Sequence, residues 1–289
     1  MATDITAETV HLRARAKINL ALHVTGQRRD GYHELDSLVA FADIANGDRL
    51  TVTYGSATIP RLTIDGPFAG SVPHGSDNIV VRAAEACGGI AAVHLHKGLP
   101  VASGIGGGSA DAAAVLQAAL ARGDERETLM AIALELGADV PVCVAGRPCR
   151  MAGIGEVLTP AAMPAIPAIL VNPGVPVETK AVFAHLAEKR NAPLPPLPVQ
   201  PDLATLVDWL GTTRNDLEAP AIAYAPAIAA VIEAAGAMPG CRFARMSGSG
   251  ATVFALFANA AERDAALPRL AEAGEGWWIA PGEIEPSAA

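Results

Sequence analysis

The chain has 289 residues, 51% of them hydrophobic and 18% charged, a composition that supports a sizeable core and argues against intrinsic disorder. The net charge of −9 argues against a general nucleic-acid binder, although a few local Lys and Arg residues can still form a pocket for an anionic small molecule. Four dispersed cysteines without a CxxC pair, no signal peptide and no apolar run of membrane length predict a cytoplasmic enzyme with reduced thiols and neither nucleic-acid nor membrane partners.

The first hundred residues are predicted to be mainly β-strand. Alternating and β-branched runs predict strands at residues 10–16, 19–24, 50–54, 61–64 and 93–96. The glycine-containing stretch 25–32 is expected to be a turn, and the third and fourth of these strands are expected to pair as a hairpin. One helix is expected at residues 78–86, with Ser76 or Asp77 as its N-cap.

Beyond residue 100 the pattern becomes mainly helical. Helices are predicted at residues 110–122, 125–136, 179–189, 203–210, 221–235 and 260–272. Gly137 and Asn259 are expected to cap two of them. Strands are predicted at residues 168–171, 242–246, 252–257 and 277–280, and the segment 191–201, with five prolines in eleven residues, is expected to be a loop. These elements predict an α+β fold with a domain boundary near residue 160.

The segment from Pro100 to Asp111 carries most of the functional signal. Its three consecutive glycines (106–108) remove side chains that would keep backbone N–H groups away from an anion, and the helix that follows adds its dipole. The segment lacks the Gly-Lys-Ser/Thr of a Walker A loop, and Ser109 stands where a dinucleotide fingerprint needs its third glycine. From the residues alone, a phosphate-binding loop and a plain flexible loop before a helix both remain open.

Several sequence blocks together resemble the GHMP kinases, named for galactokinase, homoserine, mevalonate and phosphomevalonate kinases. The run Pro-x-x-x-Gly-Ile-Gly-Gly-Gly-Ser-Ala, starting at Pro100, is similar to the family's phosphate motif. Further blocks resemble the branch that phosphorylates 4-diphosphocytidyl-2-C-methyl-D-erythritol: AKINL (16–20) with TGQRRDGYH (25–33), LGADVP (136–141), NDLE (215–218) and MSGSGA (246–251). Because they occur in the family's order over most of the chain, the match is far more specific than any single block.

The resemblance implies a two-domain α+β kinase, with a ribosomal-S5-like nucleotide domain at residues 1–160 and a ferredoxin-like substrate domain at residues 161–289. It implies that ATP, with Mg²⁺, phosphorylates the 2-hydroxyl of 4-diphosphocytidyl-2-C-methyl-D-erythritol in the non-mevalonate route to isoprenoid precursors. This cytidine diphosphate-linked small molecule would be the partner, the protein would be a monomer or a homodimer, and no resident metal site is expected. Ala110 replaces a serine frequent in the family and Ile105 replaces a leucine; neither removes a group that the chemistry needs.

Asp139 and Lys17 match the positions of the family's catalytic pair. Asp139 is the candidate base for the accepting hydroxyl, and Lys17 would keep it ionised and stabilise the transferring phosphoryl group. From the residues alone, Asp139 equally suits a helix cap or a turn, and Lys17 equally suits a solvated strand edge.

Asn19, Tyr32 and His33 are the expected acceptor-side residues. A histidine can hydrogen-bond the polar edge of a cytosine ring, and Tyr32 can stack on one of its faces. The resemblance places Phe183 on the opposite face and Thr179 beside the substrate. Taken alone, Phe183 also suits a buried helix face.

The expected ATP-binding residues are those of the glycine segment and two residues before it. They are Pro100, Ser103, Gly104, Gly106, Gly107, Gly108, Ser109, Asn78 and Lys97. Asn78 and Lys97 would lie near adenine or ribose, although Asn78 also suits a helix start and Lys97 a turn. Gly248, in a Gly/Ser turn between two strands, would present an N–H group to a substrate phosphate or belong to an ordinary hairpin turn.

Two other functions stay open. One is another GHMP kinase, of the homoserine or mevalonate type; the Asp-Gly-Tyr-His run at 30–33 argues against it, because an aromatic next to a histidine suits a cytosine and has no evident use for homoserine. The other is a nucleotide-binding sensor that kept the fold without catalysis, and the presence of both Lys17 and Asp139 argues against that.

Overall fold

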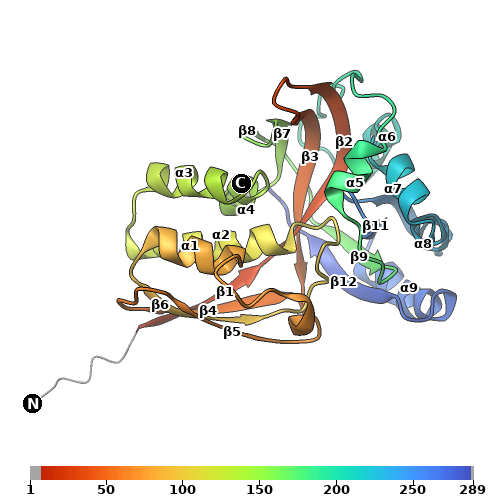
Figure 1. Cartoon of the computed structure of the whole chain (residues 1–289). Helices are drawn as coiled ribbons and strands as arrows, with labels where there is room; N and C mark the ends of the chain where they lie inside the picture. The colour runs from red at the N-terminus through yellow and green to blue at the C-terminus, as the bar shows by residue number, and fades with distance from the viewer. Residues whose placement is uncertain (1–7, 288–289) are drawn as a thin grey trace, which may run out of the picture. The chain divides into compact units, whose positions relative to one another are not determined.

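The computed structural model describes residues 8–287, which form the α+β fold expected from the sequence (Figure 1). Contacts divide the chain into two compact units that interleave in sequence. Unit 1 consists of Met1–Arg15, Gly47–Val101 and Gly107–Ala145, and unit 2 consists of Ala16–Asn46, Ala102–Gly106 and Gly146–Ala289. These units are not successive halves of the chain, and the family-domain boundary near residue 160 stays a prediction.

Unit 1 is built around a sheet that has four strands within the described residues, in the order β1–β4–β6–β5. Its strands are β1 (Thr9–Ala14), β4 (Asp48–Tyr54), β5 (Arg61–Asp65) and β6 (Ile90–His96). The hairpin expected between residues 50–54 and 61–64 is wrong, because β4 and β5 each pair with β6 instead. β5 runs parallel to β6, and a parallel pair needs a crossover segment, which here contains helix α1 (Ile79–Cys87).

The helices of unit 1 cover its sheet. After α1 come α2 (Gly107–Arg122), α3 (Arg126–Leu136) and α4 (Val140–Ala145). Figure 1 shows α1 and α2 side by side over one face of the sheet. The alanines of α2 are small enough for close packing against its neighbours, and Ala112, Ala114 and Ala118 are fully buried there.

The ends of these helices differ in part from the prediction. Asn78, rather than Ser76 or Asp77, caps α1, because its side-chain oxygen accepts the Val80 N–H at 2.8 Å. α2 begins at Gly107, before the expected start at residue 110, so two glycines assigned to a loop belong to its first turn. Gly137 ends α3 as expected. The short α4 was not expected, because six residues are too few for a clear helical period.

Unit 2 contains a second sheet, with eight strands in the described residues. Seven follow the order β10–β11–β9–β12–β3–β7–β8, and β2 pairs with β3. The strands are β2 (Ala16–Gln27), β3 (His33–Ile44), β7 (Cys149–Gly153), β8 (Val157–Pro160), β9 (Ile166–Asn172), β10 (Cys241–Met246), β11 (Val253–Phe257) and β12 (Trp278–Ile284). β2 and β3 form one long antiparallel hairpin, so the turn expected at 25–32 is shorter than predicted. The sequence did not predict β7 and β8, where an arginine, a glycine and a proline interrupt the apolar alternation.

Five helices accompany this sheet in the described chain: α5 (Thr179–Ala184), α6 (Leu203–Gly211), α7 (Glu218–Tyr224), α8 (Ala227–Gly236) and α9 (Ala260–Ala273). α5 is shorter than predicted, and the single helix expected at 221–235 is two helices that part at Pro226, which has no N–H to continue the ladder. Asn259 caps α9 as expected, accepting the Glu262 N–H at 2.9 Å. α8 and α9 pack on the sheet over a core that includes Val231 and Leu270. No helix in the described chain is long and apolar enough to cross a membrane.

Candidate active site

Two of the buried polar side chains of strand β2 in unit 2 are Lys17 and Asn19. They are two residues apart and therefore share one face of the strand. Lys17 is 4% exposed, and its Nζ donates to Asn19 Oδ1 at 2.8 Å. The Asn19 amide in turn donates to Ser37 Oγ at 2.8 Å. The solvated-edge alternative for Lys17 is thus wrong, because its charge is held inside the protein by oriented acceptors.

The Gly/Ser turn between β10 and β11, residues 247–250, contacts β2 directly. Ser247 is fully buried; its Oγ accepts the Asn19 N–H at 3.0 Å and donates to Gly104 O at 3.0 Å. Two backbone bonds hold the residues that flank Gly104: Thr252 N donates to Ser103 O at 3.1 Å, and Lys17 N donates to Ile105 O at 2.9 Å. One hydroxyl and two backbone bonds therefore join β2, the turn and residues 103–105 of the glycine segment within unit 2.

Two glycines make this close approach possible. Gly104 has φ +76° and Gly248 has φ +55°, a backbone conformation that other residues rarely adopt. A Cβ on Gly104 would lie 2.5 Å from Ser247 O, and a Cβ on Gly248 would lie 2.8 Å from Gly104 O. These glycines are needed for backbone packing, a reason that the sequence pattern of an anion-binding loop does not reveal.

The other end of the glycine segment forms the first turn of α2 in unit 1. The first N–H groups of a helix have no partner within the helix, so this turn can bind an anion. A Cβ on Gly108 would meet only Ile79, at 3.8 Å, whereas a Cβ on Gly107 would lie 3.1 Å from Lys97 Nζ. Gly108 is exposed and Ser109 is partly exposed, so both are accessible to a ligand.

Lys97 lies in a buried ionic cluster of unit 1 that the sequence did not predict. Its Nζ is 2.5 Å from Asp48 Oδ2 and 2.6 Å from Asp111 Oδ2, and all three side chains are almost fully buried. The other Asp48 oxygen accepts the N–H groups of Gly98 and Leu99 at 2.8 and 2.9 Å. The cluster therefore holds the backbone that leads into the glycine segment. The one sequence feature that points to this ionic cluster is Asp111, a carboxylate inside an alanine-rich helix.

The charges in this cluster do not balance, since two carboxylates face one ammonium. Burial acts to lower the pKa of Lys97, but the charges of Asp111 and Asp48 outweigh burial and raise it. Burial raises the pKa of Asp111 to about 7, against the opposing effect of Lys97. Asp111 Oδ1 is buried and has no hydrogen-bond partner among the described residues, whereas Asp48 accepts two backbone N–H groups. Asp111 is thus the group of this cluster that tends to keep a proton.

Asn78 and Asp139, also in unit 1, each stand at the start of a helix. Asn78 caps α1, and its amide donates to Pro73 O at 2.6 Å, so both ends of its side chain serve the local backbone. Asp139 directly precedes α4 and is partly buried. Lys17 belongs to unit 2 and Asp139 to unit 1, and the pairing of these two residues stays a prediction.

His33 and Phe183 are brought together in unit 2. Their rings stack with centroids 4.6 Å apart and an interplanar angle of 21°. Phe183 also packs against the unit 2 core, so the same side chain contributes to the core and stacks on His33. Burial, and then the charge of Lys189, lower the pKa of His33, which keeps the ring neutral near pH 7. Tyr32, next to this pair, is 59% exposed.

Thr179, which lies in α5 with Phe183, joins this helix to the Gly/Ser turn. Its hydroxyl lies 2.8 Å from Ser249 Oγ, so α5 and the turn share a hydrogen bond in unit 2. The hydrogen bonds of Ser37, Ser247 and Ser249 could not be predicted from the sequence, because their partners lie in other segments of the chain. Within residues 8–287, no group of three or more His, Cys, Asp or Glu side chains is arranged to hold a metal ion.

Comparison with known proteins identifies two family domains in the chain. The model of the GHMP kinase N-terminal domain matches residues 78–147, and that of the GHMP kinase C-terminal domain matches residues 198–276. A 4-diphosphocytidyl-2-C-methyl-D-erythritol kinase of Cereibacter sphaeroides is 54% identical over 94% of this chain and 98% of its own length.

Solved structures agree with this result. The crystal structure of a 4-(cytidine 5'-diphospho)-2C-methyl-D-erythritol kinase superimposes with a TM-score of 0.75 at 34% identity, covering 96% of this chain and 100% of that chain. A homoserine kinase from Cytophaga hutchinsonii superimposes with a TM-score of 0.66 at 17% identity over 99% of this chain and 98% of its own, a likeness of fold alone.

Proposed function

This chain belongs to the 4-diphosphocytidyl-2-C-methyl-D-erythritol kinases of the GHMP kinase family, and from that premise we propose how its own residues take part in the reaction. The enzyme transfers a phosphoryl group from ATP to the 2-hydroxyl of 4-diphosphocytidyl-2-C-methyl-D-erythritol, a step in isoprenoid precursor synthesis. The observation that carries the residue assignments is the buried series of contacts from Lys17 through Asn19 and Ser247 to Gly104.

Asp139 is assigned as the base and Lys17 as the fixed positive charge. Phosphoryl transfer depends mainly on positioning and on neutralising the charge of the transferred group. Asp139 directly precedes α4, and its carboxylate is the group that can accept the proton of the attacking hydroxyl. The ammonium of Lys17, oriented by Asn19, stabilises the phosphoryl group during transfer.

The phosphates of ATP are assigned to the glycine segment. Its members are Pro100, Ser103, Gly104, Gly106, Gly107, Gly108 and Ser109. The accessible first turn of α2 supports this assignment, because Gly108 has open space around it and its neighbours offer N–H groups. Lys97 and Asn78 complete the nucleotide side, where they act through the backbone that they hold.

Mg²⁺ is proposed to accompany ATP, with the Ser109 hydroxyl as a ligand from this chain. The accessible position of Ser109 in the first turn of α2 suits this role, and a hydroxyl oxygen is a donor that Mg²⁺ accepts. When bound, Mg²⁺ neutralises charge on the phosphates.

The cytosine of the acceptor is assigned to the surroundings of His33. A neutral imidazole can both donate and accept a hydrogen bond at the polar edge of cytosine. Phe183 and the exposed Tyr32 offer aromatic faces for stacking. Asn19 and Thr179 are assigned to the rest of the acceptor. Gly248 is assigned to a substrate phosphate, through its N–H group.

The remaining proposals concern organisation. Residues 1–160 are assigned to the nucleotide domain and residues 161–289 to the substrate domain, which is supported by the family models on either side of residue 160. The enzyme is assigned to the cytoplasm as a monomer or a homodimer, and sedimentation at the assay concentration distinguishes these two states.

The substrate is tested by measuring ATP consumption with diphosphocytidyl-methylerythritol, homoserine and mevalonate, each with Mg²⁺. Turnover is expected with the first alone. Turnover with another member of this panel, and none with the first, overturns the substrate assignment and leaves a kinase of another specificity.

The base is tested with Asp139→Asn. This variant is expected to lose turnover by about a hundredfold or more while it still binds ATP, because the amide cannot accept the hydroxyl proton. Steady-state kinetics and ATP titration measure the two properties separately. Near-normal turnover in this variant would refute the assignment of the base.

A further inference from the structure

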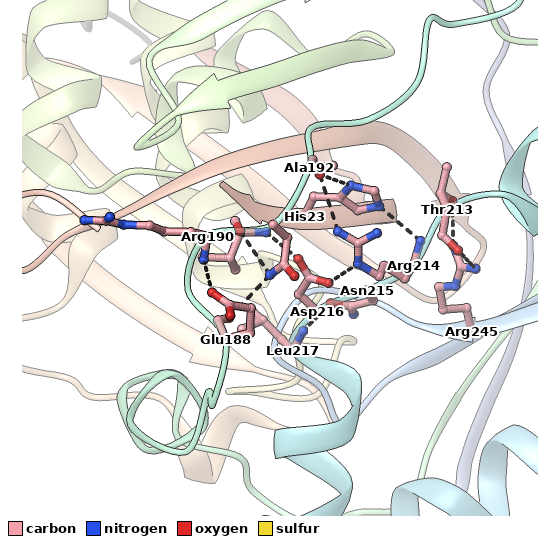
Figure 2. Close-up of polar contacts among 12 residues, drawn as sticks. His23, Glu188, Arg190, Ala192, Thr213, Arg214, Asn215, Asp216, Leu217 and Arg245 are labelled. Atoms are coloured by element: carbon pink, nitrogen blue, oxygen red, sulfur yellow. Dashed lines mark hydrogen bonds and ion pairs between the residues drawn. The ribbon is translucent and has the colours of Figure 1, made fainter. Parts of the chain in front are cut away.

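The segment NDLE, residues 215–218, was singled out by the resemblance but has no place in the reaction described so far. It follows α6 in unit 2, and its last residue, Glu218, is the first residue of α7. Figure 2 shows this segment beside His23 of β2, with Asp216 reaching the side chain of Arg214.

Asn215 uses its whole side chain to hold backbone groups. Its Nδ2 donates to Met246 O at 2.9 Å and to Gly248 O at 2.8 Å, and its Oδ1 accepts the Leu217 N–H at 3.0 Å. The residue is 6% exposed, so these bonds are made away from solvent. Both amide donors therefore reach the backbone around the Gly/Ser turn.

The rest of the segment attaches this contact to β2 and β10. Asp216 Oδ2 accepts the Val24 N–H at 2.7 Å, and Asp216 N donates to Leu22 O at 2.8 Å. Glu218 Oε2 accepts the Met246 N–H at 3.0 Å. These hydrogen bonds hold the backbone around Asn215 between β2 and β10. The orientation of its side-chain amide is set by its own bonds to Met246 O, Gly248 O and Leu217 N.

The contacts of Arg245 do not duplicate this arrangement. Its guanidinium binds Thr213, Leu210 O and Leu20 O, which ties α6 to β2 and β10 without reaching the Gly/Ser turn. In the 215–218 segment, Asn215 is the member whose side chain contacts Gly248. It thus links the segment to the turn that contacts Asn19 and Gly104 through Ser247 and Thr179 through Ser249.

We propose that Asn215 is a positioning residue for phosphoryl transfer, which sets the Gly/Ser turn and through it the places of Asn19, Gly104 and Thr179. This inference rests on the proposed function. Asn215 acts through the turn, because its amide groups are already used by the backbone.

The test uses Asn215→Asp, which keeps the size and the acceptor of the side chain but replaces two donors with an oxygen that repels Met246 O and Gly248 O. The matched control is Asp216→Asn, its neighbour, which keeps an acceptor for Val24 N and puts an NH2 group in place of the oxygen that pairs with Arg214, a side chain 45% exposed and able to turn away. Asn215→Asp replaces an amide NH2 with a carboxylate oxygen, and Asp216→Asn makes the reverse replacement at the next residue.

In the full-length enzyme, Asn215→Asp is expected to lower kcat by about tenfold to a hundredfold at a temperature where it is folded, the cost of a small misplacement of reacting groups. Asp216→Asn is expected to stay within about threefold of the unmodified enzyme. Hydrogen–deuterium exchange of residues 246–251 is expected to rise in the first variant alone. A merely structural role would lower the melting temperature and leave kcat and the local exchange unchanged.

Equal kcat in the two variants, with equal exchange in the turn, overturns the proposal. If Asn215→Asp does not fold, Asn215→Ser takes its place; it keeps one short donor, and kcat equal to that of Asp216→Asn then overturns the proposal. If the unmodified enzyme does not turn over diphosphocytidyl-methylerythritol, the proposed function fails instead, and the same comparison is made with whichever panel substrate is turned over.

Discussion

Gly104 and Gly248 show how a single missing side chain shapes this protein. Each would place a Cβ less than 3 Å from a backbone carbonyl of the opposite segment, at 2.5 and 2.8 Å respectively. A backbone carbonyl cannot move aside as a flexible side chain can. The glycines therefore set how closely the glycine segment approaches the Gly/Ser turn.

Gly248→Ala is expected to reduce turnover by about tenfold or more, because a methyl group would force Gly104 and Asn19 away from the turn. Gly88→Ala is the control: its φ of +63° is close to the +55° of Gly248, but nothing lies within 4 Å of its added Cβ. Both variants are expected to lose about 1–3 kcal/mol of stability from the positive φ, which for Gly88, at ψ 173°, lies in a region that glycine almost alone occupies. Kinetics and thermal unfolding separate this shared cost from the loss of turnover, and equal turnover in the two variants contradicts the prediction.

The pKa of His33 gives a second prediction at this scale. Burial lowers it most and the charge of Lys189 lowers it further, so the neutral ring persists to lower pH. Lys189→Gln is expected to raise the pKa of His33 and shift the acid limb of kcat/KM for the acceptor to higher pH by less than about one unit. Lys180→Gln is the control, since Lys180 does not shift His33. NMR titration of His33 measures the pKa, and an unchanged or lower value counts against the assignment.

At this scale the sequence points to candidate residues through local motifs, but it does not show which of them contact one another. Lys17, Asn19, His33 and the glycines belong to local motifs and can be recognised in them. Asn19 and Ser247 are 228 positions apart, and no local pattern announces such a contact. Asp48 follows a glycine in a turn, where an aspartate is ordinary, so its bond to Lys97 was not foreseen.

Among the elements, the cluster of Lys97, Asp48 and Asp111 joins β4, α2 and the end of β6. It contains more negative than positive charge, and the structure keeps this surplus out of water. An uncompensated buried carboxylate favours its protonated form, and this preference links the stability of unit 1 to pH.

Asp111→Asn is expected to alter how stability depends on pH. The folded pKa of Asp111, about 7, lies above the unfolded value of 3.8, so its contribution is fully present below the unfolded value and is lost as pH rises through the folded one. The unmodified protein should therefore lose stability relative to Asp111→Asn between about pH 4 and pH 7. Denaturant unfolding at several pH values measures this difference, and a constant difference across the window would show that Asp111 keeps an ordinary pKa.

The helices and strands were predicted well where the hydrophobic pattern of the chain is strongly periodic. They were predicted poorly where the arrangement depends on which strands pair. Helices α2, α3 and α9 and the β10–β11 hairpin were foreseen from their local pattern. The parallel pairing of β5 with β6 was missed because strand order depends on tertiary packing. The separation of α7 from α8 at Pro226 was missed although the proline was visible in the sequence, because the apolar period continues across it.

For the whole molecule, the four cysteines test the reduced state expected from the composition. None of the four forms a disulfide within the described residues: Cys143 and Cys149 are buried, and Cys87 and Cys241 are partly buried. Burial raises the pKa of Cys87 and of Cys149 to about 11, so few thiolates exist near neutral pH.

The native protein is consequently expected to react slowly with Ellman's reagent at neutral pH. All four thiols should react quickly after unfolding in guanidinium chloride. Fast reaction of one equivalent in the native state would show that one thiol is more accessible than the structure indicates.

The last strand of the chain has an unusual place for a terminal element, since β12 lies between β9 and β3 in the interior of its sheet. A ribosome releases residues in order, so the polypeptide must carry two unpaired strand edges until residues 278–284 emerge. Products that end before residue 278 would keep those edges open, and open edges recruit other chains. A chain truncated before residue 278 is therefore expected to yield aggregates rather than a shortened enzyme.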